Sequence, residues 1–391
     1  MAALVAAGVQ VGLDRVDAGK GAPLLGKRVG LVVHAASLTA DGRHAIDVLR
    51  AHRVDVLRLL TPEHGLRSRA AAGEKVAGGV DQASGLPIVS LYGERTKPNA
   101  ADLEGLDSLV FDLQDAGARF YTYMSTMVLC LEAAAEAGIE FVVLDRPNPL
   151  GGERVEGPVS DPRDVIARSL VNTTPGPLVH GLTAGEMARF VNATLPKPAR
   201  LTVVAMKGWR RSMTWTDTGR AWPVPSPNLR TADAAISYPG TCLLEGTNVT
   251  EGRGSDAPFL LIGAPWLHAS KIQNAVRVPG FGLVPASFTP RASEAALQPK
   301  HGGVLCQGLR VELGDAHRAE PYRLGVALLR ALKDLEPDFA WRGDGSGFDR
   351  LVGTKRLRAA IERGDSVDAI VAADAAAIAE WKRTRKSALL Y

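Results

Sequence analysis

The chain has 391 residues, of which 46% are apolar and 23% charged, and its formal net charge is +4. These values exclude intrinsic disorder and collagen-like repeats, and mixed charges along the chain argue against a nucleic-acid partner. Three widely spaced cysteines argue against a disulfide framework and a zinc site, so no metal or cofactor is expected. Glycine and proline are numerous, at 41 and 24 residues, whereas aromatic residues make up only 5%.

The distribution of apolar residues predicts whether the chain spans a membrane and whether it carries a signal peptide. No run approaches 18 consecutive apolar residues, so no membrane-spanning helix is expected. Residues 1–12 are apolar but lack the basic start and polar flank of a signal peptide. The default expectation is therefore a cytoplasmic protein, and export after removal of a leader is the alternative.

Short apolar segments alternate with helical ones through the first half. Strands are expected at 27–33, 54–60, 87–92, 108–113, 140–144 and 201–204, and helices at 41–52, 125–137 and 183–193. Such alternation is typical of a mostly parallel sheet covered on both faces. Residues 209–265 are rich in Pro, Gly and Trp; beyond them, strands are expected at 286–289 and 308–312, and helices at 322–333, 355–364 and 367–385.

The expected fold class is α/β. A Rossmann-like, mostly parallel sheet domain is expected at 1–207, followed by a smaller α/β (α+β) domain at 208–391.

Polar residues gather where four expected strands end. The carboxyl ends of parallel strands meet at one edge of a sheet, where ligands bind. These ends read TPEHG (61–65), YGER (92–95), DLQDAGARFYTY (112–123) and DRPNP (145–149). One such segment is usually a helix cap or turn, but four at one edge favour an active-site rim.

Several familiar sites are excluded by their motifs. The segment GAPLLGKR (21–28) lacks the Ser or Thr of a phosphate-binding loop and precedes a strand. Dinucleotide, zinc-protease and serine-hydrolase motifs are also missing. The remaining carboxylates, histidines, arginines and tyrosines suit acid–base hydrolysis of a small substrate, and paired carboxylates are usual in glycosidases.

The second half supplies further polar segments. His180 precedes a helix whose start, Thr183 and Glu186, reads as a capping box, and His180 itself is open between a site role and a structural one. Residues 238–259 are expected to form a long polar loop, which is usually functional in a compact domain.

Taken together, these motifs resemble one bacterial family. The strings are TPEHG, DLQDAGARFYTY, LDRPNP, HGLT, SPNL, YPGTCLLEGTN, EGRGSDAPF, GAPW and the terminal LLY. They are similar to glycoside hydrolase family 171, the exo-β-N-acetylmuramidases, formerly a bacterial domain of unknown function. The resemblance runs from about residue 9 to Tyr391. It implies an active-site cleft between the two domains and hydrolysis of β-linked N-acetylmuramic acid from the non-reducing end of peptidoglycan fragments.

The resemblance also implies residue roles. Glu63 is the leading catalytic carboxylate, with His64 beside it and Asp115 as a further catalytic candidate. The expected substrate-binding residues are Asp112, Gln114, Arg119, Tyr121, Tyr123, Arg146, Asn148, His180, Glu245, Asn248 and Arg253. The chain departs from the family at the first strand's exit, where His34 and two alanines replace the usual Asn-Gln-Thr, a loss that could alter substrate contacts or activity.

The implied substrate adds a physical expectation. N-acetylmuramic acid carries a lactyl carboxylate, for which Arg119, Arg146 and Arg253 are candidate partners, because a guanidinium holds a carboxylate by two hydrogen bonds. Tyr121 or Tyr123 is expected either to form a platform for the sugar or to pack at a helix start. A non-catalytic muropeptide-binding or sugar-binding protein and a hydrolase of another class remain the alternatives.

Overall fold

A seven-stranded sheet organises the first half of the computed structural model, which describes residues 8–161 and 169–391. Its order is β3-β4-β2-β1-β5-β6-β9, and only the edge strand β3 is antiparallel to its neighbour. The strands are β1 (Arg28–Val33), β2 (Asp55–Thr61), β3 (Gly79–Val80), β4 (Pro87–Ser90), β5 (Ser108–Asp112), β6 (Glu140–Leu144) and β9 (Arg200–Val204). The expected mostly parallel sheet is confirmed. The signal-peptide expectation rests partly on residues 1–7, which lie outside the described ones.

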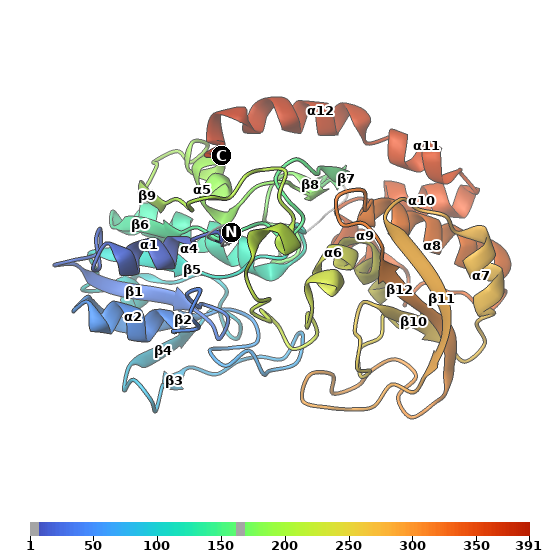
Figure 1. Ribbon diagram of the computed structural model, residues 1–391, viewed down its shortest axis with the longest axis horizontal. Helices are drawn as coiled ribbons and strands as arrows, with labels where there is room; N and C mark the ends of the chain where they lie inside the picture. Colours follow the sequence, from blue (N-terminus) through green and yellow to red (C-terminus); the bar gives the residue numbers. More distant parts are fainter. Residues whose placement is uncertain (1–7, 162–168) are drawn as a thin grey trace, which may run out of the picture.

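Helices cover both faces of this sheet (Figure 1). One face carries α1 (Gly12–Ala18) and α2 (Ala45–Ala51). The other carries α3 (Ala100–Leu103), α4 (Thr122–Ala137) and α5 (Ala184–Asn192). Alternate residues of β1 face opposite cores, with Val29, Leu31 and Val33 on the α1–α2 side and Val32 on the other. Burial on both faces explains why the strands are continuous apolar runs in the sequence.

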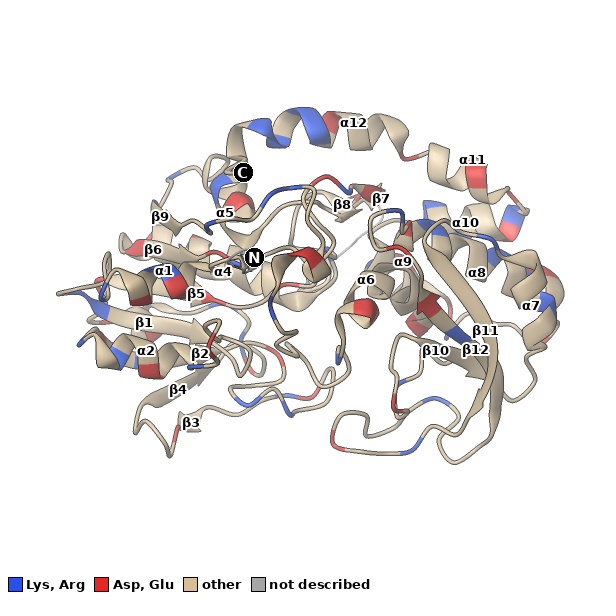
Figure 2. Cartoon of the chain, in the orientation of Figure 1, with Lys and Arg blue, Asp and Glu red and all other residues tan. Residues whose placement is uncertain are grey.

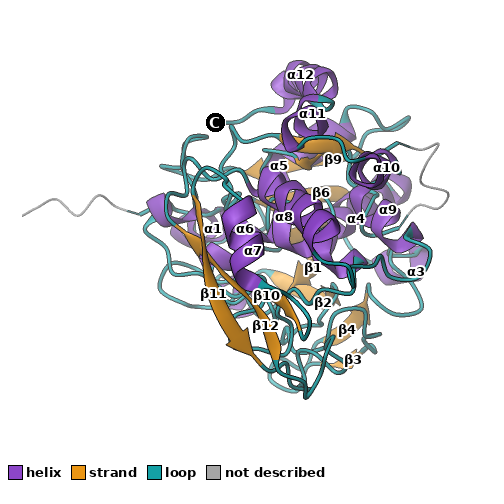
Figure 3. Ribbon diagram, turned by 90° about the vertical axis from the view of Figure 1, so that its right-hand side faces the viewer, coloured by secondary structure: helices purple, strands orange, loops and turns teal. Residues whose placement is uncertain are grey.

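A smaller antiparallel sheet organises the second half. Its strands β10 (Leu261–Ala264), β11 (Phe281–Phe288) and β12 (Cys306–Leu313) have the order β10-β12-β11, and α7 lies against them (Figure 3). The helices are α6 (Ala232–Thr241), α7 (Ala269–Ala275), α8 (Pro321–Leu335), α9 (Ser346–Val352), α10 (Arg356–Arg363), α11 (Val367–Ala372) and α12 (Ala375–Thr384). Short 3-10 helices are η1 (Trp215–Thr218), η2 (Cys242–Gly246) and η3 (Arg385–Ala388), and β7 (Glu156–Val159) pairs with β8 (Pro177–Val179). This arrangement confirms the expected two-part α/β fold.

Two expectations about the second half are wrong. Residues 238–259 are not one loop, because α6 runs to Thr241 and η2 continues to Gly246. Gly240 serves close packing, since a Cβ atom there would lie 2.1 Å from the carbonyl oxygen of Pro321 at the start of α8. The single helix expected at 367–385 is divided into α11 and α12.

The C-terminal segment returns to the first half. Helix α12 arches over the molecule and brings the chain end beside α5 (Figure 1). There the Tyr391 hydroxyl donates to Asp145 Oδ2 at 2.7 Å, the Leu390 amide donates to Glu186 Oε1 at 3.0 Å, and Arg189 donates to the Leu389 carbonyl at 2.9 Å. The domain division at residue 207 stays a prediction. Residues 375–391 follow it in the sequence but pack on the first half, which contains the seven-stranded sheet.

Charged residues of both signs are distributed over both halves of the molecule (Figure 2). Lys and Arg are interspersed with Asp and Glu in both halves (Figure 2). None of the helices within 8–161 and 169–391 combines the length and apolar character needed to cross a bilayer.

Candidate active site

Glu63, just after β2, is held at the sheet edge by donors from three separate segments. Its Oε1 accepts a hydrogen bond from the Gly73 amide at 2.8 Å, and its Oε2 accepts one from Thr122 Oγ1, at the start of α4, at 2.8 Å. The Tyr92 phenol, beyond β4, also interacts with this carboxylate, and burial together with Glu63 raises the pKa of Tyr92. Glu63 is 8% exposed, and these donors hold its two oxygens in place.

His64 is positioned by a strained turn beside Glu63. Both His64 (φ 70°) and Gly65 (φ 69°) are in the left-handed region, which is uncommon for a histidine. The ring Nδ1 lies 2.7 Å from the Ala70 carbonyl oxygen, to which it can only donate. Burial lowers the pKa of His64, against the opposing effect of Glu63. The neutral ring therefore carries its proton on Nδ1 and leaves Nε2 as an acceptor.

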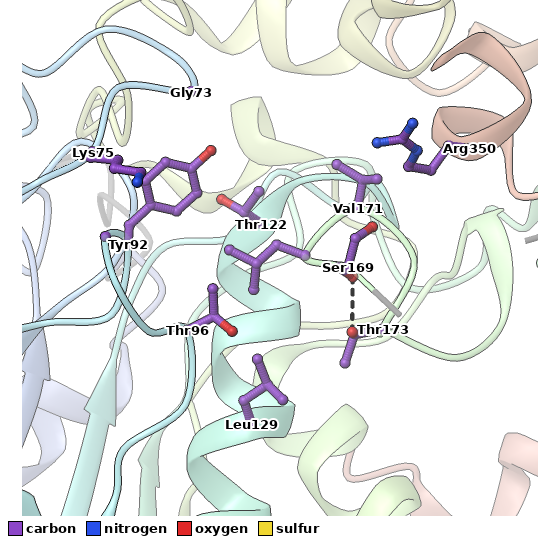
Figure 4. A pocket seen from close by; sticks show the side chains of 12 residues that line it. Gly73, Lys75, Tyr92, Thr96, Thr122, Leu129, Ser169, Val171, Thr173 and Arg350 are labelled. Carbon is purple, nitrogen blue, oxygen red and sulfur yellow. Dashed lines mark hydrogen bonds between the residues drawn. The ribbon is translucent and has the colours of Figure 1, made fainter. Parts of the chain in front are cut away.

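Gly73, a hydrogen-bond partner of Glu63, lines two cavities. The first, of about 530 Å³, is lined by three partners of Glu63, namely Gly73, Tyr92 and Thr122 (Figure 4). Its remaining wall is made by Lys75, Gly93, Thr96, Leu129, Ser169, Leu170, Val171, Thr173 and Arg350. The second, of about 460 Å³, is lined by residues 71–74 and by second-half residues that include Glu245, Glu251, Arg253, Lys300 and Arg342. Among the described residues, Glu63 itself lines neither cavity, but it accepts a hydrogen bond from Gly73, which lines both, and each cavity has walls from both halves of the molecule.

Asp115 and His180 form a buried pair away from these cavities. Asp115 Oδ2 accepts from the Gly117 amide at 2.7 Å and lies 3.4 Å from His180 Nε2. His180 Nδ1 accepts from the Leu182 amide at 3.1 Å, so the opposite ring nitrogen carries the proton. Asp115 is 6% exposed and His180 is fully buried, so the pair supports the loops that bear the site.

Tyr121 and Tyr123 pack as part of an aromatic cluster. Their rings lie 4.8 Å apart, and Tyr238 lies 5.8 Å from Tyr121. Tyr123 donates from its hydroxyl to the Pro225 carbonyl at 2.8 Å. Neither ring lines the two cavities beside Gly73. The structure therefore favours the packing alternative over the sugar platform.

Four expected substrate-binding residues brace the strand ends. Arg146 Nε and Nη2 donate to the two Asp112 oxygens at 2.6 and 2.9 Å, and both side chains are buried. Gln114 donates through Nε2 to the carbonyls of Asp115 and Pro147, both at 2.8 Å. Asn148 donates to the Leu182 carbonyl at 3.0 Å. The charges of Arg146 and Asp112 are therefore paired within the protein, and substrate binding by these residues stays a prediction.

The other two arginines proposed for the lactyl carboxylate contact protein groups, although the buried Nε and Nη1 of Arg119 have no hydrogen-bond partner in the described part of the chain. Arg119 is fully buried and donates to the Val352 carbonyl, and burial lowers its pKa to about 10. Arg253 pairs with Glu245 at 2.6 Å and Glu251 at 3.3 Å. The Arg253–Glu245 pair does line the second cavity.

Asn248 faces the second half instead of the cavities. Its Nδ2 donates to the Asp338 carbonyl at 2.7 Å, and its Oδ1 accepts from the Ala340 amide at 3.0 Å. It therefore fastens the segment before α9, and the structure gives no support to substrate contact.

The departure at His34 has a structural explanation. Its Nε2 accepts from the Gln114 amide at 3.1 Å, and its ring lies 5.0 Å from that of Tyr123. Burial lowers the pKa of His34 well below the usual range. A neutral imidazole thus braces the exits of β1 and β5 from inside.

Sequence reasoning missed five residues at the first cavity. Tyr92 and Thr122 stand inside strand-end segments that were identified, but no motif singled them out. Gly73 and Lys75 lie in a glycine-rich stretch without periodicity, and Arg350 lies on a short helix without a motif.

Comparisons with known proteins agree along the whole chain. The N-terminal model of the exo-beta-N-acetylmuramidase NamZ matches residues 29–233, and the C-terminal model matches 236–391. The peptidoglycan beta-N-acetylmuramidase NamZ of Bacillus subtilis (strain 168) is 40% identical over 388 residues, which cover 98% of this chain and 91% of that protein. Two crystal structures of DUF1343 family proteins from Bacteroides fragilis NCTC 9343 align with TM-scores of 0.87 and 0.78, at 31% and 32% identity. Each alignment covers 98% of this chain and 99% of the other. The chain therefore belongs to the exo-beta-N-acetylmuramidase NamZ family.

Proposed function

We propose that this chain is an exo-acting glycoside hydrolase that releases β-linked N-acetylmuramic acid from the non-reducing end of peptidoglycan fragments. Its 40% identity to a peptidoglycan beta-N-acetylmuramidase along nearly the whole chain supports the reaction class. The observation that carries the site is the buried Glu63 carboxylate, held by Gly73, which lines two cavities, and by Thr122, which lines the first of them. The partner is a small molecule, a muropeptide or a disaccharide fragment.

The geometry suits Glu63 as the catalytic carboxylate. Glycosidases place a carboxylate at the bond to be broken, with sugar on both sides of it. The two cavities that share Gly73, a hydrogen-bond partner of Glu63, offer space for sugar next to this carboxylate. Donors already in place on both oxygens reduce the reorganisation needed as charge develops. His64, which adjoins Glu63, is the second proposed group, whereas the buried Asp115 serves as a positioning residue.

The test compares two chromogenic substrates, a β-N-acetylmuraminide and the matching β-N-acetylglucosaminide. The wild-type protein is expected to hydrolyse only the first. Glu63→Gln is expected to lower kcat by about 10²–10⁴-fold, the range for acid–base groups, with an unchanged circular dichroism spectrum. Glu104→Gln is the matched control, because this exposed carboxylate comes directly after the C-terminal end of α3.

The outcomes separate the alternatives. Near-full turnover by Glu63→Gln would refute its catalytic role. Tight calorimetric binding of the fragment by wild-type protein without product would favour a muropeptide-binding protein. Loss of wild-type turnover in EDTA would favour a metal-dependent hydrolase of another class.

A further inference from the structure

The cavity beside Glu63 has an unbalanced charge. Among the described residues that line it, Lys75 and Arg350 are cationic and none is Asp or Glu. Both side chains are exposed, and neither forms an ion pair or hydrogen bond with another residue in the described ranges. They stand on opposite sides of the cavity, Lys75 next to Tyr92 and Arg350 across from it (Figure 4).

The neighbouring cavity differs in this respect. Its Arg253 pairs with Glu245 and Glu251, and its Lys300 pairs with Glu251 at 2.9 Å. Glu74 also lines this second cavity, so its cations and carboxylates are equal in number among the described residues. Of these cations, only Arg342 forms no ion pair or side-chain hydrogen bond with a described residue. The first cavity is therefore the better receptor for an anion.

We propose that the 530 Å³ cavity receives the carboxylate-bearing substituent of the sugar, and that Lys75 and Arg350 determine specificity for it. The proposal rests on the proposed function, because the lactyl carboxylate is what distinguishes N-acetylmuramic acid from N-acetylglucosamine by charge. The three arginines that the sequence offered for this role are buried or already paired. Lys75 and Arg350 have their donors available, and Tyr92 and Thr122 connect their cavity directly to Glu63.

The test measures how strongly the enzyme prefers a charged substituent. The substrates are the chromogenic β-N-acetylmuraminide with a free lactyl carboxylate and the same compound as its lactyl methyl ester. The measured quantity is the ratio of kcat/KM for the acid to kcat/KM for the ester. Lys75→Gln, Arg350→Gln and the double variant are compared with wild type. Lys271→Gln and Arg210→Gln, at exposed cations outside both cavities, are the controls.

We expect wild type to prefer the acid and the double variant to lose about 10- to 100-fold of that preference, the size of one or two charge-assisted hydrogen bonds. Each single variant is expected to lose part of this preference, and the two controls are expected to keep the wild-type ratio of kcat/KM values. A loss below tenfold in the double variant, or no acid preference in wild type, would overturn the assignment while leaving the glycosidase function intact. A comparable loss in Arg342→Gln alone would place the carboxylate in the neighbouring cavity and also overturn it. Hydrolysis of neither substrate by wild type would refute the proposed function itself.

Discussion

Replacing Arg146 tests whether this residue supports the fold or binds substrate. Its guanidinium makes two hydrogen bonds to Asp112, at 2.6 and 2.9 Å, and one to the Leu38 carbonyl at 3.1 Å. Arg146 is 3% exposed and Asp112 is 0% exposed. Arg146→Met keeps most of the side-chain volume but leaves the Asp112 carboxylate buried without its partner. Breaking a buried pair in this way costs about 3–5 kcal/mol of the free energy of unfolding.

The double variant makes the test sharper. Arg146→Met combined with Asp112→Leu removes both buried charges, so most of the lost stability is expected to return. Urea unfolding at pH 7 measures the four corners of the cycle, and steady-state kinetics on the muraminide are measured in parallel. Arg15→Met, at an exposed arginine on α1, is the control and should change stability by less than about 0.5 kcal/mol. An Arg146→Met protein with wild-type unfolding and a raised KM would refute the structural interpretation and restore the substrate-binding one.

Three further predictions concern the site and the chain end. Thr122→Val removes a hydrogen-bond donor to Glu63, so kcat should fall about tenfold, the value of one charge-assisted hydrogen bond. Thr122→Ser keeps the hydroxyl and should restore kcat in the same kinetic assay. Equal kcat values for wild type and both variants would contradict the positioning role of Thr122. Deleting residues 389–391 removes four hydrogen bonds to the first half and should lower the urea-measured free energy of unfolding by about 2–4 kcal/mol; no change would show that these residues do not stabilise the fold. Burial raises the pKa of Asp145 to about 6 despite its hydrogen-bond donors, so the folded state holds this proton more tightly than the unfolded chain. The stabilisation that Asp145 contributes is therefore present below about pH 4 and is lost as the pH rises to about 6. Asp145→Asn should remove this contribution to the pH dependence of the free energy of unfolding, measured between pH 4 and 6.

The sheet was predictable because its strands are buried on both faces. A strand such as β1 needs apolar residues at nearly every position, which leaves a plain signal in the sequence. The region of α6 carried the opposite signal, since Pro239 and Gly240 are ordinarily loop residues. Gly240 is there because α8 packs too closely for a side chain, a tertiary requirement that local pattern does not express.

The site was predictable only in part, for a related reason. Polar residues at four strand ends indicated one edge of the sheet, and the family resemblance singled out Glu63 there. The sequence did not indicate which charges neutralise one another, because Arg146 and Asp112 are 34 residues apart and meet only in the fold. Lys75 and Arg350 were missed because an unpaired cation is recognised by its surroundings, and those come from separate parts of the chain.

The contact between Tyr391 and Asp145 has a consequence for synthesis on the ribosome. The two residues are 246 positions apart, and elongation at about 5–20 residues per second separates their appearance by about 10–50 s. During that interval, β6 and α5 have been made but lack the tail that hydrogen-bonds to Asp145, Glu186 and Arg189. The first half therefore cannot form these hydrogen bonds until residues 389–391 have been translated, so the last step of its folding depends on their synthesis.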